Sequence, residues 1–293
     1  MKAEYITPAV TPFDPDGRPD FDEMVRLYEH LITGGISGIL ILGSIGEFFA
    51  ISKEDKKAMI HCAAEKIGRR VKYFVGTNSM IPGETVELSQ YALEQGANGV
   101  VVVPPYYFTL TQESIYEFYA DIASQVKGDV YIYNFPDRTG YEIAPETMLR
   151  LAQDFPNIAG CKDTIAGMDH TREIIRLVKP VRPDFKVYSG FDDNFAHNVL
   201  SGGDGCIGGL SNVIPEFFKG WMDAFEKENL QEIAQKQKQV NSLMEVYQVG
   251  TPFVPYIKAA LAAKGIISSK KAAFPMPEAS EESIASLRKI LEF

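Results

Sequence analysis

A lysine at the end of an apolar segment is the first feature of this sequence that predicts chemistry. Lys162 closes the run Ile158-Ala159-Gly160-Cys161, and Asp163 and Thr164 follow it. Such a run is typical of a short buried strand, and burial disfavours the charged form of an amine. A neutral amine is a nucleophile that condenses with ketones to form a Schiff base. The simpler alternative is that Lys162 pairs with a carboxylate, for which Asp163 is the nearest candidate.

A phenol stands at the matching end of the preceding apolar segment. Tyr133 lies in Tyr131-Ile132-Tyr133-Asn134-Phe135-Pro136, about one strand earlier in the chain. A phenol within hydrogen-bond reach of a reacting group can give or take a proton. Lys162 and Tyr133 together therefore predict carbonyl chemistry through a covalent imine.

Other predicted strand ends carry residues that suit the binding of an acid. Gly43-Ser44-Ile45-Gly46-Glu47 comes just before a predicted helix, where glycines and free N–H groups suit a carboxylate and the Ser44 hydroxyl can pass a proton. A plain glycine-rich turn is the alternative. The Arg138 guanidinium is a candidate for binding a carboxylate through two hydrogen bonds, unless it pairs with Asp137. Tyr106 and Tyr107 form an aromatic pair that can also pack at an interface.

The order of the segments predicts a (β/α)8 TIM barrel, of class α/β, with a C-terminal helical extension. Short apolar strands alternate with amphipathic helical segments and recur at roughly 20 to 35 residues, the length of a strand-plus-helix unit. We expect the barrel over residues 1–225 and the extension over 226–293. No GxGxxG follows the first strand, which weighs against a doubly wound dinucleotide-binding sheet. The expected strands are Tyr5–Val10, Gly38–Leu42, Lys72–Gly76, Gly99–Val103, Val130–Asn134, Ile158–Lys162, Lys186–Ser189 and Gly205–Ile207.

Composition limits the partners and the compartment. The 293 residues carry a net charge of -10, which argues against general affinity for nucleic acid or anionic membranes but not against a small acidic substrate. The start of the chain, Met1–Pro8, lacks the apolar run of a signal peptide. Three cysteines without a CxxC pair predict reduced, buried thiols in a cytoplasm: Cys62, Cys161 and Cys206. The histidines have no metal-binding spacing, so neither a metal nor a cofactor is expected.

Three motifs in this order resemble the pyruvate-dependent class I aldolase and synthase family. They are Gly43–Glu47, Tyr133-Asn134-Phe135-Pro136 with Thr139-Gly140, and Gly160-Cys161-Lys162-Asp163-Thr164. The family includes dihydrodipicolinate synthase, N-acetylneuraminate lyase and 2-keto-3-deoxy sugar acid aldolases. The resemblance extends over essentially the whole chain.

The resemblance implies a role for each motif residue. Lys162 would form the Schiff base with pyruvate or a 2-keto acid, and Tyr133 would be the acid–base phenol. Ser44 would relay its proton, and Tyr107 would reach in from a neighbouring subunit of a homotetramer built as a dimer of dimers. The backbone amides of Ser44 and Ile45 would hold the keto acid's carboxylate. Gly190 and Ile207 match positions that line the pocket.

Two residues point toward different substrates. Ile45 stands where the family often has a second hydroxyl residue, which points away from the typical synthase. Arg138 matches the arginine that holds the carboxylate of aspartate semialdehyde in the synthase, which points toward it. We therefore expect a lyase that cleaves or forms a 2-keto-3-deoxy sugar acid from pyruvate and a hydroxyaldehyde. Dihydrodipicolinate synthase is the alternative, followed by a sugar-acid dehydratase and a barrel that only binds a small acid.

Overall fold

A computed structural model describes all residues, 1–293, and its eight parallel strands close into a barrel in the order β1 to β8. This confirms the predicted fold class. The strands are β1 (Glu4–Pro8), β2 (Gly38–Ile41), β3 (Lys72–Gly76), β4 (Gly99–Val102), β5 (Val130–Asn134), β6 (Ile158–Asp163), β7 (Lys186–Ser189) and β8 (Gly205–Ile207). None of the helices combines the length and apolar character needed to cross a membrane.

By their internal contacts the residues form two compact units. The first unit is Met1–Lys72 with Gly208–Phe293, and the second unit is Tyr73–Ile207. The predicted boundary of a C-terminal extension at residue 226 remains a prediction.

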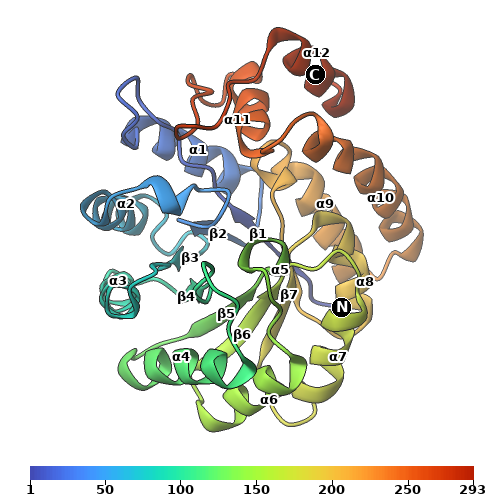
Figure 1. The fold of residues 1–293 in the computed structure, drawn as a ribbon. Coiled ribbons are helices and arrows are strands. Elements are labelled where there is room, and N and C mark those ends of the chain that lie inside the picture. The colour runs from blue at the N-terminus through green and yellow to red at the C-terminus, as the bar shows by residue number, and fades with distance from the viewer. The chain divides into compact units, whose positions relative to one another are not determined.

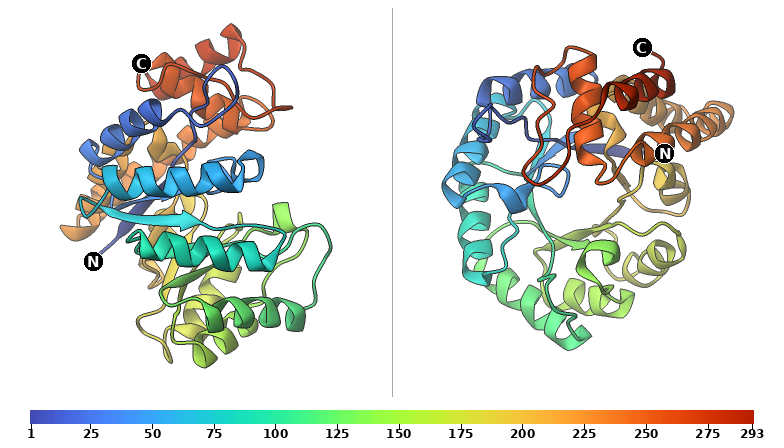
Figure 2. Two further views of the ribbon diagram at one scale, coloured as in Figure 1. Left: turned by 90° about the vertical axis from the view of Figure 1, so that its left-hand side faces the viewer. Right: turned by 45° about the horizontal axis from the view of Figure 1, so that its top comes forward.

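In the first unit, the helices after β8 form the C-terminal part of the chain, coloured orange to red in Figure 2. Within this part α9 packs on α10, and α11 packs on α12. The helices of the first unit are α1 (Phe21–Thr33), α2 (Lys53–Lys66), α9 (Pro215–Glu226), α10 (Leu230–Leu243), α11 (Val254–Ala263) and α12 (Glu281–Leu291).

The helices of the second unit are α3 (Pro82–Glu94), α4 (Gln112–Gln125), α5 (Pro136–Thr139), α6 (Pro145–Asp154), α7 (Asp169–Val178) and α8 (Phe195–Leu200). Helices α4, α6 and α7 pack in series along strands β4 to β7 (Figure 1).

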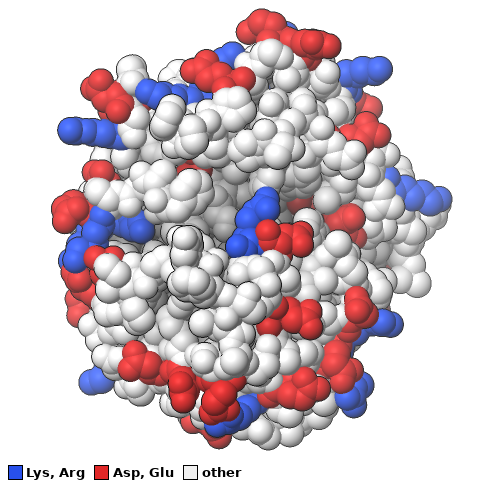
Figure 3. Space-filling view, in the orientation of Figure 1, with Lys and Arg blue, Asp and Glu red and all other residues white.

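Acidic side chains gather over α4 and α6 (Figure 3), in keeping with the net negative charge of the chain.

Local sequence explains where the long helices begin. The side chains of Asp20, Ser52 and Thr111 each accept a hydrogen bond from the backbone N–H three residues later, at the starts of α1, α2 and α4. These N-caps satisfy a donor that the helix itself leaves free. Pro82 and Pro145 begin α3 and α6, where a missing N–H costs nothing.

The observed strand ends differ from the predicted ones in four strands, of which β2 and β4 each stop one residue early, at Ile41 and Val102. β1 ends at Pro8 rather than Val10, because the N–H of Val10 bonds to the side chain of Asn212. β6 extends one residue further than predicted, to Asp163, because Asp163 is in register with Asn134 of β5 and Ser189 of β7. The additional residue lies directly beside Lys162.

Gly160 allows β6 to pass close to its neighbours. A Cβ atom at this position would lie 2.4 Å from the carbonyl oxygen of Lys186 and 2.8 Å from the ring of Tyr131. Real Cβ atoms do not approach backbone this closely, so the strand that carries Lys162 needs a glycine here.

We predict that Gly160→Ala lowers the free energy of unfolding by about 1–3 kcal/mol, the range for overpacking a well-packed core. Urea unfolding of the wild type and the variant measures this difference. Gly83→Ala is the matched control, because a Cβ at Gly83 meets nothing within 4 Å. Equal losses in both variants would contradict the role given to Gly160.

Candidate active site

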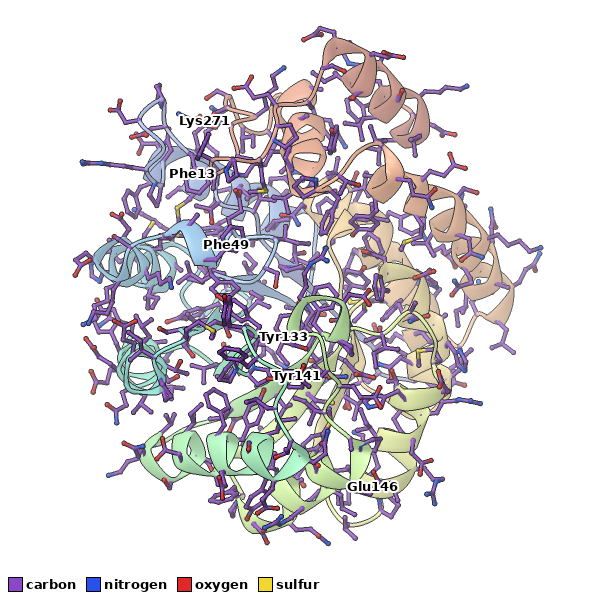
Figure 4. The ribbon with its side chains drawn as sticks, viewed as in Figure 1. Phe13, Phe49, Tyr133, Tyr141, Glu146 and Lys271 are labelled. Atoms are coloured by element: carbon purple, nitrogen blue, oxygen red, sulfur yellow. The ribbon has the colours of Figure 1, made fainter.

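Lys162 and Tyr133 lie side by side on adjacent strands. They are directly paired in the β5–β6 register, and both are buried, with 5% and 2% of their surface exposed. The Lys162 Nζ atom is 3.4 Å from the Tyr133 hydroxyl and 4.4 Å from the centre of its ring. Figure 4 shows Tyr133 beside α5. A buried amine and a phenol in hydrogen-bond reach can exchange a proton with each other or with a bound carbonyl compound.

Asp163 is not the partner of Lys162. Its carboxylate accepts hydrogen bonds from the side chains of Asn134 (2.7 Å), Thr171 (2.6 Å) and His170 (3.0 Å). Successive side chains of a strand point to opposite faces, so Asp163 turns toward α7 while Lys162 turns the other way. The simpler reading of Lys162 as half of an Asp163 ion pair is therefore wrong.

The Asp163 network connects the two strands that carry the lysine and the phenol. Asn134 follows Tyr133 as Asp163 follows Lys162, and the Oδ1 atom of Asn134 accepts from the N–H of Ile143 at 2.9 Å. His170 bonds through Nδ1 to Asp163 and through Nε2 to the carbonyl oxygen of Ile143 (3.1 Å). Both ring nitrogens of His170 face acceptors, an arrangement that favours the protonated imidazole, which donates from both nitrogens.

Sequence reasoning missed this network. The sequence analysis gave no role to Asn134 or His170. The sequence did show that Asn134 follows Tyr133 directly, in the same way as Asp163 follows Lys162. Register between the strands was the missing information.

Arg138 belongs to a stack that begins at Tyr133. The rings of Tyr133 and Phe135 stack with centroids 5.9 Å apart, and the Arg138 guanidinium lies 5.3 Å from the Phe135 ring centre. Arg138 is exposed and donates to the backbone oxygen of Asp137 at 3.3 Å. The guanidinium thus lies over an aromatic face with most of its donors facing solvent.

Two further predicted pocket residues end neighbouring strands. Gly190 follows β7, where a Cβ would lie 1.9 Å from the Thr164 hydroxyl, so any other residue would displace the segment after Lys162. Ile207 is buried and ends β8. Ile207 lies in the glycine-rich segment 202–209. A Cβ at Gly203 of this segment would lie 2.1 Å from the Asn198 side chain, so close packing accounts for this glycine.

Tyr107 is separate from this group in the single chain. It is 78% exposed and contacts Phe108 edge to face at 4.9 Å between ring centres. Nearby, Tyr141 donates its hydroxyl to the carbonyl oxygen of Pro105, and burial raises the pKa of Tyr141 to about 12. The loop after β4 is therefore fastened at Pro105 and presents Tyr107 and Phe108 outward.

Ser44 and Ile45 lie in the first unit, after β2. Ser44 is half-buried, and its carbonyl oxygen accepts from the N–H of Glu47 at 3.1 Å. A single 3-10 turn, Phe48–Ala50, follows this segment, and the predicted helix begins at Lys53 as α2. Glu47 takes a left-handed conformation, which prevents an α-helix from starting there. The segment therefore lies one 3-10 turn before α2, and carboxylate binding by its amides stays a prediction.

The cysteines behave mostly as predicted. Cys161 and Cys206 are buried, whereas Cys62 is only half-buried. Burial raises the pKa of the Cys161 thiol well above its usual value. Such a thiol is protonated at neutral pH and packs as an apolar group.

The fold and the strand-end residues define a parallel (β/α)8 barrel with a buried lysine–phenol pair. The sequence profile of the Dihydrodipicolinate synthetase family matches residues 1–293. The chain belongs to this family, whose members named here are aldolases and synthases, and it is an enzyme of the carbon–carbon lyase type.

Individual relatives carry two kinds of name. The chain is 36% identical over 278 residues to a probable 2-dehydro-3-deoxy-D-pentonate aldolase of Escherichia coli, covering 95% of this chain and 92% of the relative. It is 38% identical over 283 residues to a 4-hydroxy-tetrahydrodipicolinate synthase of Kosmotoga olearia, covering 97% and 95%. The crystal structure of the E. coli prophage protein YagE in complex with pyruvate matches with a TM-score of 0.96 and 34% identity, covering 99% and 97% of the two chains.

We predict that His170→Gln makes the free energy of unfolding less dependent on pH. Burial lowers the pKa of His170, but the hydrogen bond and charge of Asp163 outweigh it and raise the pKa overall. A raised pKa means that protonated His170 stabilises the folded state fully below about pH 6.5, and that this contribution is lost as the pH rises through the folded-state value.

The free energy of unfolding of the wild type should exceed that of His170→Gln most near pH 6. The difference should shrink once the pH rises above about 6.5, the ordinary pKa of histidine. Urea unfolding across this range measures it. His197→Gln, an exposed histidine of the same unit, is the control. A pH-independent difference for His170→Gln would contradict the charged state assigned to His170.

Proposed function

We propose that this protein is a Schiff-base lyase that cleaves, or in reverse forms, a 2-keto-3-deoxy sugar acid. The products of cleavage are pyruvate and a hydroxyaldehyde. The observation that carries the proposal is the buried contact between Lys162 and the Tyr133 hydroxyl. Relatives named as 2-dehydro-3-deoxy-D-pentonate and 2-dehydro-3-deoxy-D-gluconate aldolases support it.

The first step joins the substrate to Lys162. The Nζ lone pair attacks the C2 carbonyl carbon, the carbonyl oxygen takes up a proton, and the resulting carbinolamine loses water to leave an iminium ion. Tyr133 lies where it can supply and recover these protons. The attack uses the neutral form of the Lys162 amine.

The second step breaks the carbon–carbon bond. Tyr133, as the phenolate, takes the proton of the C4 hydroxyl, the C3–C4 bond cleaves, and its electron pair moves into the iminium ion to give an enamine. The aldehyde leaves, C3 of the enamine is protonated, and water hydrolyses the pyruvate imine to release Lys162. The iminium ion is itself the electron sink, so this chemistry requires no metal and no cofactor.

The remaining site residues complete the proposal. Ser44 passes protons to and from Tyr133, and Tyr107 of a neighbouring subunit extends this relay in a homotetramer. The Ser44 and Ile45 amides hold the keto acid's carboxylate, and Gly190 and Ile207 line the pocket. The exposed position of Tyr107 supports its use by another subunit. We place this reaction in the cytoplasm, in line with the free cysteines.

We predict that Lys162→Ala abolishes the release of pyruvate from 2-keto-3-deoxygluconate and 2-keto-3-deoxypentonate. The loss should be at least about a thousandfold, because the covalent step is removed entirely. A coupled pyruvate assay measures the rate, and borohydride in the presence of pyruvate should add a stable mass to the wild type alone. Lys127→Ala, an exposed lysine of the same unit, should keep the wild-type rate. Full activity in Lys162→Ala would refute the mechanism.

Arg138 is the specific observation that favours a second function, condensation of pyruvate with aspartate semialdehyde. A guanidinium with donors facing solvent suits the carboxylate of that aldehyde. The synthase of Kosmotoga olearia is as similar to this chain as the sugar acid aldolases are.

We predict that Arg138→Ala separates the two functions. If the partner is aspartate semialdehyde, kcat/KM for condensation should fall by roughly 10- to 100-fold, the value of a charged hydrogen bond. If a neutral sugar chain occupies this end, pyruvate release should fall only a few-fold. Arg138→Lys is the companion variant, because a lysine keeps the positive charge but cannot form the two parallel hydrogen bonds of a guanidinium to a carboxylate. A large loss of sugar-acid cleavage in Arg138→Ala would contradict this assignment.

A further inference from the structure

A fully buried ion pair joins two distant parts of the first unit. Glu47 ends the segment Gly43–Glu47, and Lys258 lies in α11. Their side chains have 0% of their surface exposed, and the carboxylate contacts the ammonium directly. Lys258 is the one charged residue in the otherwise apolar helix VPYIKAALAA. A lone lysine in such a helix requires a specific partner, and Glu47 is that partner.

Glu47 and Lys258 also form hydrogen bonds to the backbone of the segment after α11. The Oε2 atom of Glu47 accepts from the N–H of Ala273 at 2.7 Å, and Lys258 Nζ donates to the carbonyl oxygen of Lys271 at 2.9 Å. Lys258 also lies 4.1 Å from the centre of the Phe13 ring. Figure 4 labels Phe13 and Lys271 in this part of the first unit. The pair thus fixes Gly43–Glu47 to α11 and to residues 271–273.

The anchored segment has a strained backbone. Glu47 has φ 58° and ψ 36°, a left-handed conformation that residues with a Cβ rarely adopt. Its N–H closes a turn onto Ser44, and the Thr11 hydroxyl holds the carbonyl oxygen of Gly46 at 2.7 Å. Such a conformation persists only where the surroundings impose it. The carboxylate anchor at Glu47 and the Thr11 contact are those surroundings.

The pair is poorly explained by stability alone. Burial raises the pKa of Glu47 and lowers the pKa of Lys258 to about 8, even though each attracts the charge of the other. The folded protein therefore disfavours both charges relative to water. Buried pairs of this kind can often be replaced by apolar groups without loss of stability. Their complete burial also prevents either group from touching a substrate.

We infer that Glu47 and Lys258 are positioning residues for the keto-acid-binding segment Gly43–Glu47, so that the chain after β8 sets the affinity for the substrate carboxylate. This inference rests on the proposed function, in which the Ser44 and Ile45 amides hold that carboxylate. Glu47 fixes the turn that contains both amides. Lys258 and Ala273 fix Glu47.

The double variant Glu47→Gln/Lys258→Met tests the inference, because it removes both charges and keeps the approximate volumes. Borohydride trapping of pyruvate on Lys162, followed by intact mass at increasing pyruvate, gives the half-saturating concentration and the maximal labelled fraction. We expect the half-saturating concentration to rise roughly 10- to 100-fold, as for a small misplacement of binding groups. The maximal fraction and the Tm should stay at or above the wild-type values.

Two further variants keep the test decisive. Glu29→Gln/Arg70→Met removes a surface ion pair of the same unit and should leave pyruvate binding unchanged. Glu47→Gln alone keeps the shape of the side chain and its acceptor for Ala273, and it should also raise the half-saturating concentration.

The outcomes separate the inference from the function on which it rests. If the wild type is not trapped, the Schiff-base proposal and the inference are both wrong. Wild-type half-saturation in the folded double variant, or in Glu47→Gln, would overturn the inference alone. The same holds for a lowered Tm with unchanged half-saturation, because that result describes a purely structural pair.

Discussion

The register between β5 and β6 is the constraint on which the candidate site depends. It places Tyr133 opposite Lys162 and Asn134 opposite Asp163. Because side chains alternate along a strand, the Tyr133–Lys162 pair lies on one face of the sheet and the Asn134–Asp163 pair on the other. A slip of one residue would send every side chain to the wrong face and separate both couples. The reactive pair and the network behind it are thus fixed by one ladder of backbone hydrogen bonds.

The face behind the reactive pair explains why Lys162 has a phenol and no carboxylate as its close neighbour. Asp163 accepts hydrogen bonds from Asn134 and Thr171 and contacts His170, whose pKa the carboxylate raises. A buried carboxylate with fewer partners would be costly and would attract the nearest ammonium. By satisfying Asp163 on the helix side, the fold leaves the Lys162 amine beside the Tyr133 hydroxyl, at 3.4 Å.

The sequence predicted the strands well because each is a short apolar run between polar segments. Val130–Asn134 and Lys186–Ser189 have the same bounds in prediction and structure. It also singled out Lys162 and Tyr133, which the structure confirms as neighbours on adjacent strands, while their catalytic roles stay predictions. It could not supply the partners of Asp163 or Glu47, because these come from His170 and Lys258, and such pairings depend on the packed fold. It also did not reveal the left-handed backbone of Glu47 or the 3-10 turn Phe48–Ala50 that separates Gly43–Glu47 from α2.

Reaction class and substrate choice are separated in this structure. The positions of the buried Lys162 and Tyr133 are fixed by the register between β5 and β6. Arg138 is different: it is exposed, it is tethered through one backbone oxygen, and it lies over Phe135. A side chain held this loosely can turn toward a carboxylate or leave room for a polyol at little cost in packing. Relatives of similar identity to this chain carry the names of sugar acid aldolases and of synthases.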